Sequence, residues 1–128
     1  MHTQERHPRI PIMVRVSYSY KGAYLFGYSK DMSRGGIFVQ TDHVINVGAR
    51  VLLQFSLPGH SQIIKAEGRV IWVVPSYIEK RERGKKIQIP GMGIEFLKMG
   101  VEDQNLIRRF VRDRVDSGEE VKQKASLL

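Results

Sequence analysis

The sequence predicts a mainly β fold, a six-stranded antiparallel barrel followed by one C-terminal α-helix. Three observations predict it. Six segments carry apolar or alternating residues, turn residues separate most of them, and helical periodicity occurs once, near the end of the chain. Closing the strands into a barrel removes the unpaired edges that invite aggregation. With 128 residues, the chain is long enough for one domain with a real core and too short for two.

The first three predicted strands lie before residue 41. In residues 10–20 every even-numbered side chain is apolar or aromatic, which indicates one half-buried strand. A turn at Lys21–Gly22 leads to a second strand over residues 23–31, and residues 37–40 form a third. The set Tyr18, Tyr20, Tyr24 and Tyr28 is assigned mostly to the core, because most of these tyrosines match inward positions.

The next three strands show the same alternation. The fourth points Val51, Leu53, Phe55 and Leu57 inward. The fifth places Ile64, Ala66, Gly68, Val70, Trp72 and Val74 on one face, and Gly68 predicts a bend or a close approach within it. The sixth, residues 91–96, points Met92, Ile94 and Phe96 inward.

A helix of about fifteen residues is predicted from Val101. Its apolar stripe consists of Leu106, Ile107, Phe110, Val111 and Val115. Acidic residues at its start and arginines toward its end suit the helix dipole. We expect the stripe to dock on the sheet or on a second subunit.

These elements divide the chain into a flexible N-terminal arm (residues 1–9), a barrel domain with its helix (10–115) and a polar tail (116–128). Between the fifth and sixth strands, residues 79–86 hold five basic and two acidic side chains. This segment is either a solvated loop or a basic rim for an anionic partner.

The charge favours anionic partners. Twenty-one Lys and Arg residues against 13 Asp and Glu residues give a net charge of +8. The chain has no cysteine, the N-terminus lacks the apolar core of a signal peptide, and the longest apolar run, Val70–Val74, is too short to cross a membrane. We therefore expect a cytoplasmic protein without membrane insertion.

The segment Asp31–Gly36 concentrates polar chemistry at the join between two predicted strands. Asp31 and Ser33, two residues apart in an extended segment, project from one face. The glycine pair Gly35–Gly36 permits a sharp turn or a close approach to a ligand. Taken alone, the segment is either a polar turn or an anion-binding site.

With the arm, this segment and the barrel placed, the chain resembles the PilZ domain family of bacterial cyclic di-GMP receptors. Asp31, Ser33 and Gly36 match the family's D-x-S-x-x-G motif, and the arm holds arginines in Glu5-Arg6-His7-Pro8-Arg9. The segments Gly68–Val73 and Gly91–Phe96 add to the likeness, which spans residues 5–115. The resemblance implies a PilZ-type barrel whose function is to bind cyclic di-GMP, to order its arm on binding and to signal to a partner protein.

The proposed ligand site comprises Arg6, Arg9, Asp31, Ser33, Arg34, Gly35 and Gly36. Cyclic di-GMP offers two phosphodiester anions and two guanines. Arginine can bind phosphate or the O6/N7 edge of guanine with two hydrogen bonds, and an ionised aspartate accepts from the donors of its Watson–Crick edge. Ser33 can donate or accept one bond, and Arg34 can stack on a base or approach a phosphate.

One departure from the family pattern lies in the arm. The family motif has two arginines four residues apart, whereas Arg6 and Arg9 are three apart and Glu5 occupies the first position of the pair. We expect Arg9 to be the second arginine of the pair and Arg6 to replace the first. The departure favours an alternative function, in which the domain binds no cyclic di-GMP and acts only as a protein adaptor.

Two other functions are less favoured. A nucleic-acid-binding barrel would use the charge, the tyrosines and the basic loop. An enzyme is not expected, because the four histidines lack metal-ligand spacing and no paired carboxylates or phosphate-binding glycine loop occur. We expect no cofactor and no metal. The state of assembly is left open as a monomer or a homodimer, and the partner protein is not identified.

Overall fold

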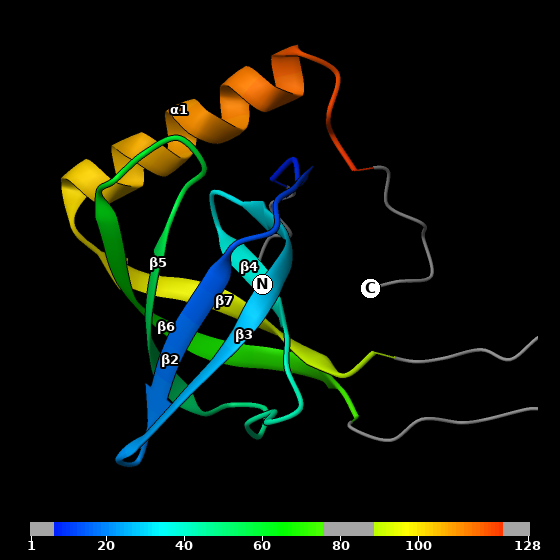
Figure 1. The fold of residues 1–128 in the computed structure, drawn as a ribbon, viewed down its shortest axis with the longest axis vertical. Helices are drawn as coiled ribbons and strands as arrows, with labels where there is room; N and C mark the ends of the chain where they lie inside the picture. The colour runs from blue at the N-terminus through cyan, green and yellow to red at the C-terminus, as the bar shows by residue number, and fades with distance from the viewer. Residues whose placement is uncertain (1–6, 76–88, 122–128) are drawn as a thin grey trace, which may run out of the picture.

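Six antiparallel strands form a closed barrel in the computed structural model, which describes residues 7–75 and 89–121 (Figure 1). The barrel strands are β2 (Arg15–Tyr20), β3 (Ala23–Ser33), β4 (Gly36–Gln40), β5 (Arg50–Ser56), β6 (Ile63–Val74) and β7 (Gly91–Met99). They pair in the order β3-β2-β5-β6-β7-β4, and β4 pairs with β3 to close the ring. The predicted mainly β barrel with a C-terminal helix is confirmed.

The first predicted strand is divided in two. A short strand, β1 (Ile10–Pro11), precedes β2, and both pair with β3. The buried side chain of Ser29 on β3 fills the interruption: its hydroxyl donates to the carbonyl of Ile12 (2.5 Å) and accepts from the amide of Val14 (2.9 Å). The alternation of residues 10–20 survives the break, because these bonds replace the missing pairs of the sheet.

The core occupies the inside of the barrel. The fourth predicted strand is confirmed in detail, with Val51, Leu53, Phe55 and Leu57 all buried. Gly68 makes the predicted close approach, since a Cβ there would lie 2.5 Å from the side chain of Ile94 on β7.

The predicted inward position of Trp72 is wrong. The register of β6 against β7 shifts between Val70 and Trp72, so that Trp72 turns outward and is 39% exposed. Its indole stacks on Phe38 with ring centroids 5.0 Å apart and lies over Gly93, where any Cβ would clash with it. The outer face of the barrel therefore carries a small aromatic stack that alternation alone did not predict.

The tyrosine assignment is half right. Tyr18 is buried and Tyr20 packs against the core, but Tyr24 and Tyr28 are 87% and 46% exposed. On β3 the inward positions before the site are Gly27 and Ser29 rather than their even-numbered neighbours. The tyrosines of this strand consequently lie on its outer face.

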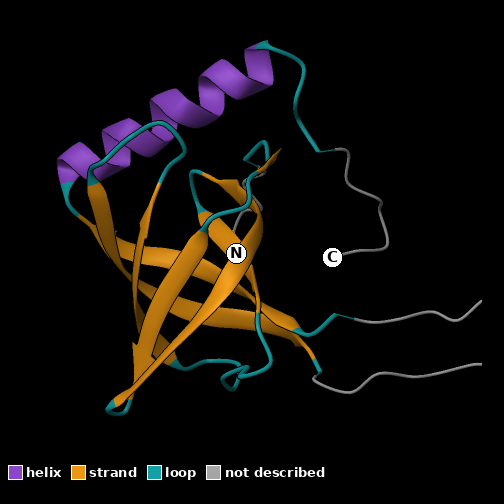
Figure 2. Ribbon diagram, in the orientation of Figure 1, coloured by secondary structure: helices purple, strands orange, loops and turns teal. Residues whose placement is uncertain are grey.

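One helix, α1 (Val101–Asp116), lies across one end of the barrel, as the purple ribbon in Figure 2 shows. Its buried residues are Leu106, Ile107, Phe110 and Val111, with Val115 partly buried, so the predicted stripe docks on the barrel's own core. Glu102 and Asp103 stand in its first turn and Arg114 in its last, which suits the dipole.

The chain after α1 turns back toward the arm. The amide of Val121 donates to the carbonyl of Arg9 at 2.8 Å, which joins the two ends of the described chain. The predicted basic segment 79–86, Arg6 and the last seven residues of the polar tail lie outside the described residues. No helix in the described ranges is both long and apolar enough to cross a bilayer.

Candidate ligand site at the barrel end

A β-bulge places the acid and the hydroxyl of the predicted site. The register of β3 against β4 shifts between Ser29 and Asp31, which leaves Lys30 as the extra residue. Ser29 and Met32 are both fully buried although they are three residues apart. The inserted residue turns Asp31 and Ser33 to the outer face, where alternation without a bulge would have pointed them into the barrel.

Arg9 meets both of these side chains. Its Nε donates to Oδ1 of Asp31 at 2.7 Å, and its Nη1 donates to the hydroxyl of Ser33 at 3.4 Å. The side chains of Arg9 and Asp31 are 24% and 17% exposed, so this ion pair is largely shielded from water. The structure thus brings Arg9 to two residues that lie 22 and 24 positions later in the sequence.

The turn after Ser33 folds back onto the same hydroxyl. The amide of Gly35 donates to Oγ of Ser33 at 3.0 Å, and the carbonyl of Gly35 accepts from the amide of Phe96 on β7 at 2.9 Å. Ser33 therefore connects the arginine of the arm to the turn.

The two glycines are required by close approaches within the protein. A Cβ at Gly36 would lie 2.5 Å from the backbone oxygen of Ile94, and one at Gly35 would lie 2.6 Å from the ring of His7. The sequence predicted that these glycines leave room for a ligand. The structure fills the space beside them with a neighbouring strand and with the arm.

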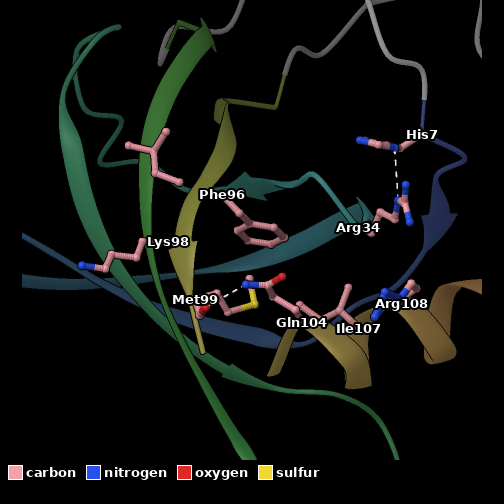
Figure 3. A pocket seen from close by; sticks show the side chains of 9 residues that line it. His7, Arg34, Phe96, Lys98, Met99, Gln104, Ile107 and Arg108 are labelled. Carbon is pink, nitrogen blue, oxygen red and sulfur yellow. Dashed lines mark hydrogen bonds between the residues drawn. The ribbon is translucent and has the colours of Figure 1, made fainter. Parts of the chain in front are cut away.

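Arg34 and His7 extend the site toward the helix. Nε of Arg34 donates to Nδ1 of His7 at 3.4 Å, and the Arg34 side chain is exposed. Both residues line a cavity of about 310 Å³ between this turn, β7 and α1 (Figure 3).

Sequence reasoning missed several residues of this cavity. His7 was read only as part of the arm. Phe96 was predicted as an inward residue and does pack against the core beside Phe55, but its place at the cavity was not predicted. Lys98 and Arg108 stood in no motif and reach the cavity only through the docking of α1 beside β7. The basic end of the predicted helix was a signal of charge, but it did not reveal which of its arginines turns toward the barrel.

Comparison with known families gives the assignment. The family model of the PilZ domain matches residues 3–113. The chain belongs to the PilZ family. The D-x-S-x-x-G pattern of the family corresponds here to Asp31, Ser33 and Gly36 on β3 and β4, and Arg9 of the arm bonds to the first two.

Solved structures of PilZ proteins share this fold. The inhibitor of motility MotI/DgrA of Bacillus subtilis has a TM-score of 0.70 at 17% identity, with 91% of this chain and 53% of the MotI chain covered. The PilZ domain of Escherichia coli YcgR, solved with c-di-GMP, has a TM-score of 0.66 at 15% identity and coverages of 91% and 99%. The K. pneumoniae MrkH–c-di-GMP complex has a TM-score of 0.66 at 16% identity and coverages of 91% and 55%.

The chain spans about half the length of MotI and of MrkH, and nearly all of the YcgR PilZ domain. The comparison with curated proteins gives no match. In the described part of the chain, no group of three or more acidic, histidine or cysteine side chains is placed to hold a metal ion.

Proposed function

We propose that this PilZ domain is a cyclic di-GMP receptor that binds its ligand at Arg9, Asp31, Ser33, Arg34, Gly35 and Gly36, with Arg6 from the arm. The observation that carries the proposal is the contact of one guanidinium with both Asp31 and Ser33. Two elements that the family motif places far apart in sequence meet here at one point. The solved complexes of YcgR and MrkH with c-di-GMP support the choice of ligand.

Each contact has a task in this proposal. Arg9 uses Nε and Nη1 on the protein, which leaves its other N–H donors for a phosphate or for the O6/N7 edge of guanine. Asp31 uses Oδ1 on Arg9 and keeps Oδ2 for the donors of a guanine Watson–Crick edge. Asp31 therefore both positions the arginine and supplies an acceptor.

The magnitudes fit a receptor. A hydrogen bond to a charged group contributes roughly 1.5–3 kcal/mol, and micromolar affinity corresponds to about 8 kcal/mol. Three or four such bonds from arginines and Asp31 reach this value once the costs of association are subtracted. Much of the attraction is ionic, so we expect the affinity to fall as salt is raised.

Signalling follows from the arm in this proposal. Arg6 and Arg9 find the anions of the ligand, the arm of residues 1–9 orders over it, and the surface shown to a partner protein changes. The carbonyl of Arg9 accepts a hydrogen bond from the amide of Val121, so movement of the arm also displaces the chain after α1. Hydrogen exchange of the arm with and without cyclic di-GMP measures this ordering.

Isothermal titration with cyclic di-GMP tests the function, with GTP as the control ligand. We expect micromolar binding of cyclic di-GMP and a loss of about 100-fold or more for Arg9→Ala and for Asp31→Ala, because each removes charged bonds at the centre of the site. Arg112→Ala is the matched control, since this arginine is 61% exposed on α1 and its charge change is the same. Unaltered binding by either site variant contradicts the proposal.

The adaptor without ligand is the second candidate. The observation that favours it is the existing Arg9–Asp31 pair, which already offsets the charge of the arginine, together with Glu5 in the position of the family's first arginine. The same titration separates the two: a well-folded wild type that takes up no cyclic di-GMP supports the adaptor.

A further inference from the structure

The cavity beside Arg34 is a candidate for a second part of the ligand site. It holds about 310 Å³ between the Arg34–Gly35 turn, β7 and the N-terminal half of α1 (Figure 3). It is continuous with the site already described, because His7 and Arg34 form one of its walls. The lower end of the usual range for small-molecule pockets is also about 300 Å³, so the cavity accepts part of a dinucleotide rather than all of it.

Two arginines from different elements face this cavity. Arg34 comes from the turn after β3 and Arg108 from α1, whereas the ammonium of Lys98 on β7 points away from the other lining side chains, as Figure 3 shows. No carboxylate lines the cavity, and Glu67, opposite Lys98 in the sheet, pairs with Arg50 at 2.9 Å. Arg108 bonds to the neutral side chain of Asn105. The positive charge here is not neutralised by the lining residues.

An apolar wall faces these cations. The ring of Phe96 and the side chains of Met99 and Ile107 line the cavity between Lys98 and Arg108, as Figure 3 shows. Gln104 closes its floor through a hydrogen bond from its amide to the carbonyl of Met99 at 2.9 Å. A flat apolar surface next to two cations suits a purine that carries a phosphate.

We propose that this cavity binds one phosphate-bearing guanine half of the ligand, with Arg34 and Arg108 as anion contacts and Phe96 as the wall for the base. The inference rests on the proposed function, and it goes beyond the motif residues by making α1 a direct contact of the nucleotide. The bound ligand then contacts α1 directly. The chain after α1 leads to Val121, whose amide donates to the carbonyl of Arg9.

Titration of cyclic di-GMP into variants of the cavity tests this. We expect Arg108→Ala to weaken binding about 10-fold, since its guanidinium contributes a charged bond, and Lys98→Ala to leave the affinity unchanged, since its ammonium points away from the cavity. Arg108→Lys keeps the charge and restores part of the affinity. Arg109→Ala is the matched control, because it removes the same charge from the next position of the exposed helix and does not line the cavity.

We expect the cavity variants to fold like the wild type. Arg108 and Lys98 are exposed, and alanine favours the helix at position 108, so circular dichroism and melting temperature stay at the wild-type values. Amide chemical shifts of residues 98 and 108 in labelled protein give a second readout and move on addition of the ligand.

The outcomes separate the two proposals. Wild-type affinity in Arg108→Ala, together with loss of binding in Arg9→Ala, overturns the second half-site and leaves the receptor function intact. A wild type that binds no cyclic di-GMP overturns both. Equal losses in Arg108→Ala and Arg109→Ala show a general effect of charge and also overturn the half-site.

Discussion

The two halves of β3 present opposite chemistry on the same outer face of the barrel. Before Lys30 the outward side chains are aromatic: Tyr24, Phe26 and Tyr28, with the guanidinium of Arg15 4.0 Å above the Phe26 ring. After Lys30 they are Asp31 and Ser33, which contact Arg9. Side chains alternate between the two faces of the strand in both halves, but the extra residue Lys30 changes which positions point outward. A single bulge therefore separates a solvated aromatic surface from a polar site.

Removal of the bulge should have the largest effect. Deleting Lys30 removes the carbonyl that accepts from the amide of Ile12 at 3.2 Å and shifts β1 relative to Asp31, so Arg9 moves away from its partners. Losing this hydrogen bond and the shielded Arg9–Asp31 pair should cost about 3 kcal/mol in the free energy of unfolding. Urea unfolding measures the loss, and titration with cyclic di-GMP should show no binding.

Lys30→Ala is the matched control for this deletion, since it removes the same side chain and keeps the extra residue. The Lys30 side chain is exposed, so its stability should stay within about 0.5 kcal/mol of the wild type. If the deletion unfolds no more easily than the substitution, the bulge is not what positions the site.

The glycines that follow the second half offer a smaller and more selective test. Gly36→Ala pushes a Cβ against the backbone of β7 and should cost about 2 kcal/mol in the free energy of unfolding. Gly35→Ala meets only the ring of His7, a side chain that can rotate away, so stability should change by less than about 1 kcal/mol.

The two glycine variants should rank differently in ligand affinity and in stability. Gly35→Ala displaces His7 from the site, and we expect weaker cyclic di-GMP binding in a protein that melts almost normally. Thermal melts and titrations on the same samples compare the two quantities. A large loss of stability in Gly35→Ala would show that the arm is part of the fold rather than of the site.

Much of the architecture follows from local patterns in the sequence. The strand of Val51 to Leu57 and the stripe of α1 were predicted residue by residue, because each buries one face against a single core and has no interruption. The motif Asp31–Gly36 was also recognised from local sequence, because its polar residues and its glycine pair are close together in the chain. The family likeness then supplied the ligand.

The errors come from places where the register shifts. Alternation cannot reveal a bulge, since the extra residue is fixed by pairing with a distant strand, and so Trp72 and Tyr28 were assigned to the wrong face. The cavity at Lys98 and Arg108 was also invisible, because it depends on how α1 docks. Local sequence patterns do not show how elements that are far apart in sequence pack against one another.

The inner side of the first half of β3 gives a test with a pH dependence. Tyr18 lies opposite Leu25, and its hydroxyl bonds to Thr41 Oγ1 (2.8 Å) and donates to the carbonyl of His43 (2.7 Å). Tyr18→Phe should lower the free energy of unfolding by about 1–2 kcal/mol, because these partners lose a bond inside the protein. Urea unfolding at neutral pH measures it.

The same residue predicts a loss of stability at high pH. Burial raises the pKa of the Tyr18 hydroxyl above its ordinary value of about 10, and the charge of Asp42 acts in the same direction. The folded protein therefore holds this proton more tightly than the unfolded chain. The contribution is complete below pH 10 and disappears as the pH rises through the raised pKa. Between pH 9 and pH 11 the wild type should lose more stability than Tyr18→Phe, and parallel curves would contradict the assignment.

The smallest effect is expected at the outermost aromatic residue. Tyr24 is 87% exposed, so Tyr24→Ser should change the free energy of unfolding by less than about 0.5 kcal/mol, in contrast to Tyr18→Phe six residues earlier in the chain. Urea unfolding at two protein concentrations checks both numbers. A loss above about 1 kcal/mol that grows with concentration would mean that this side chain is buried between copies of the chain, since only an associated state depends on concentration. The aromatic half of β3 would then be an interface, and its difference from the polar half would be one of partner rather than of solvation.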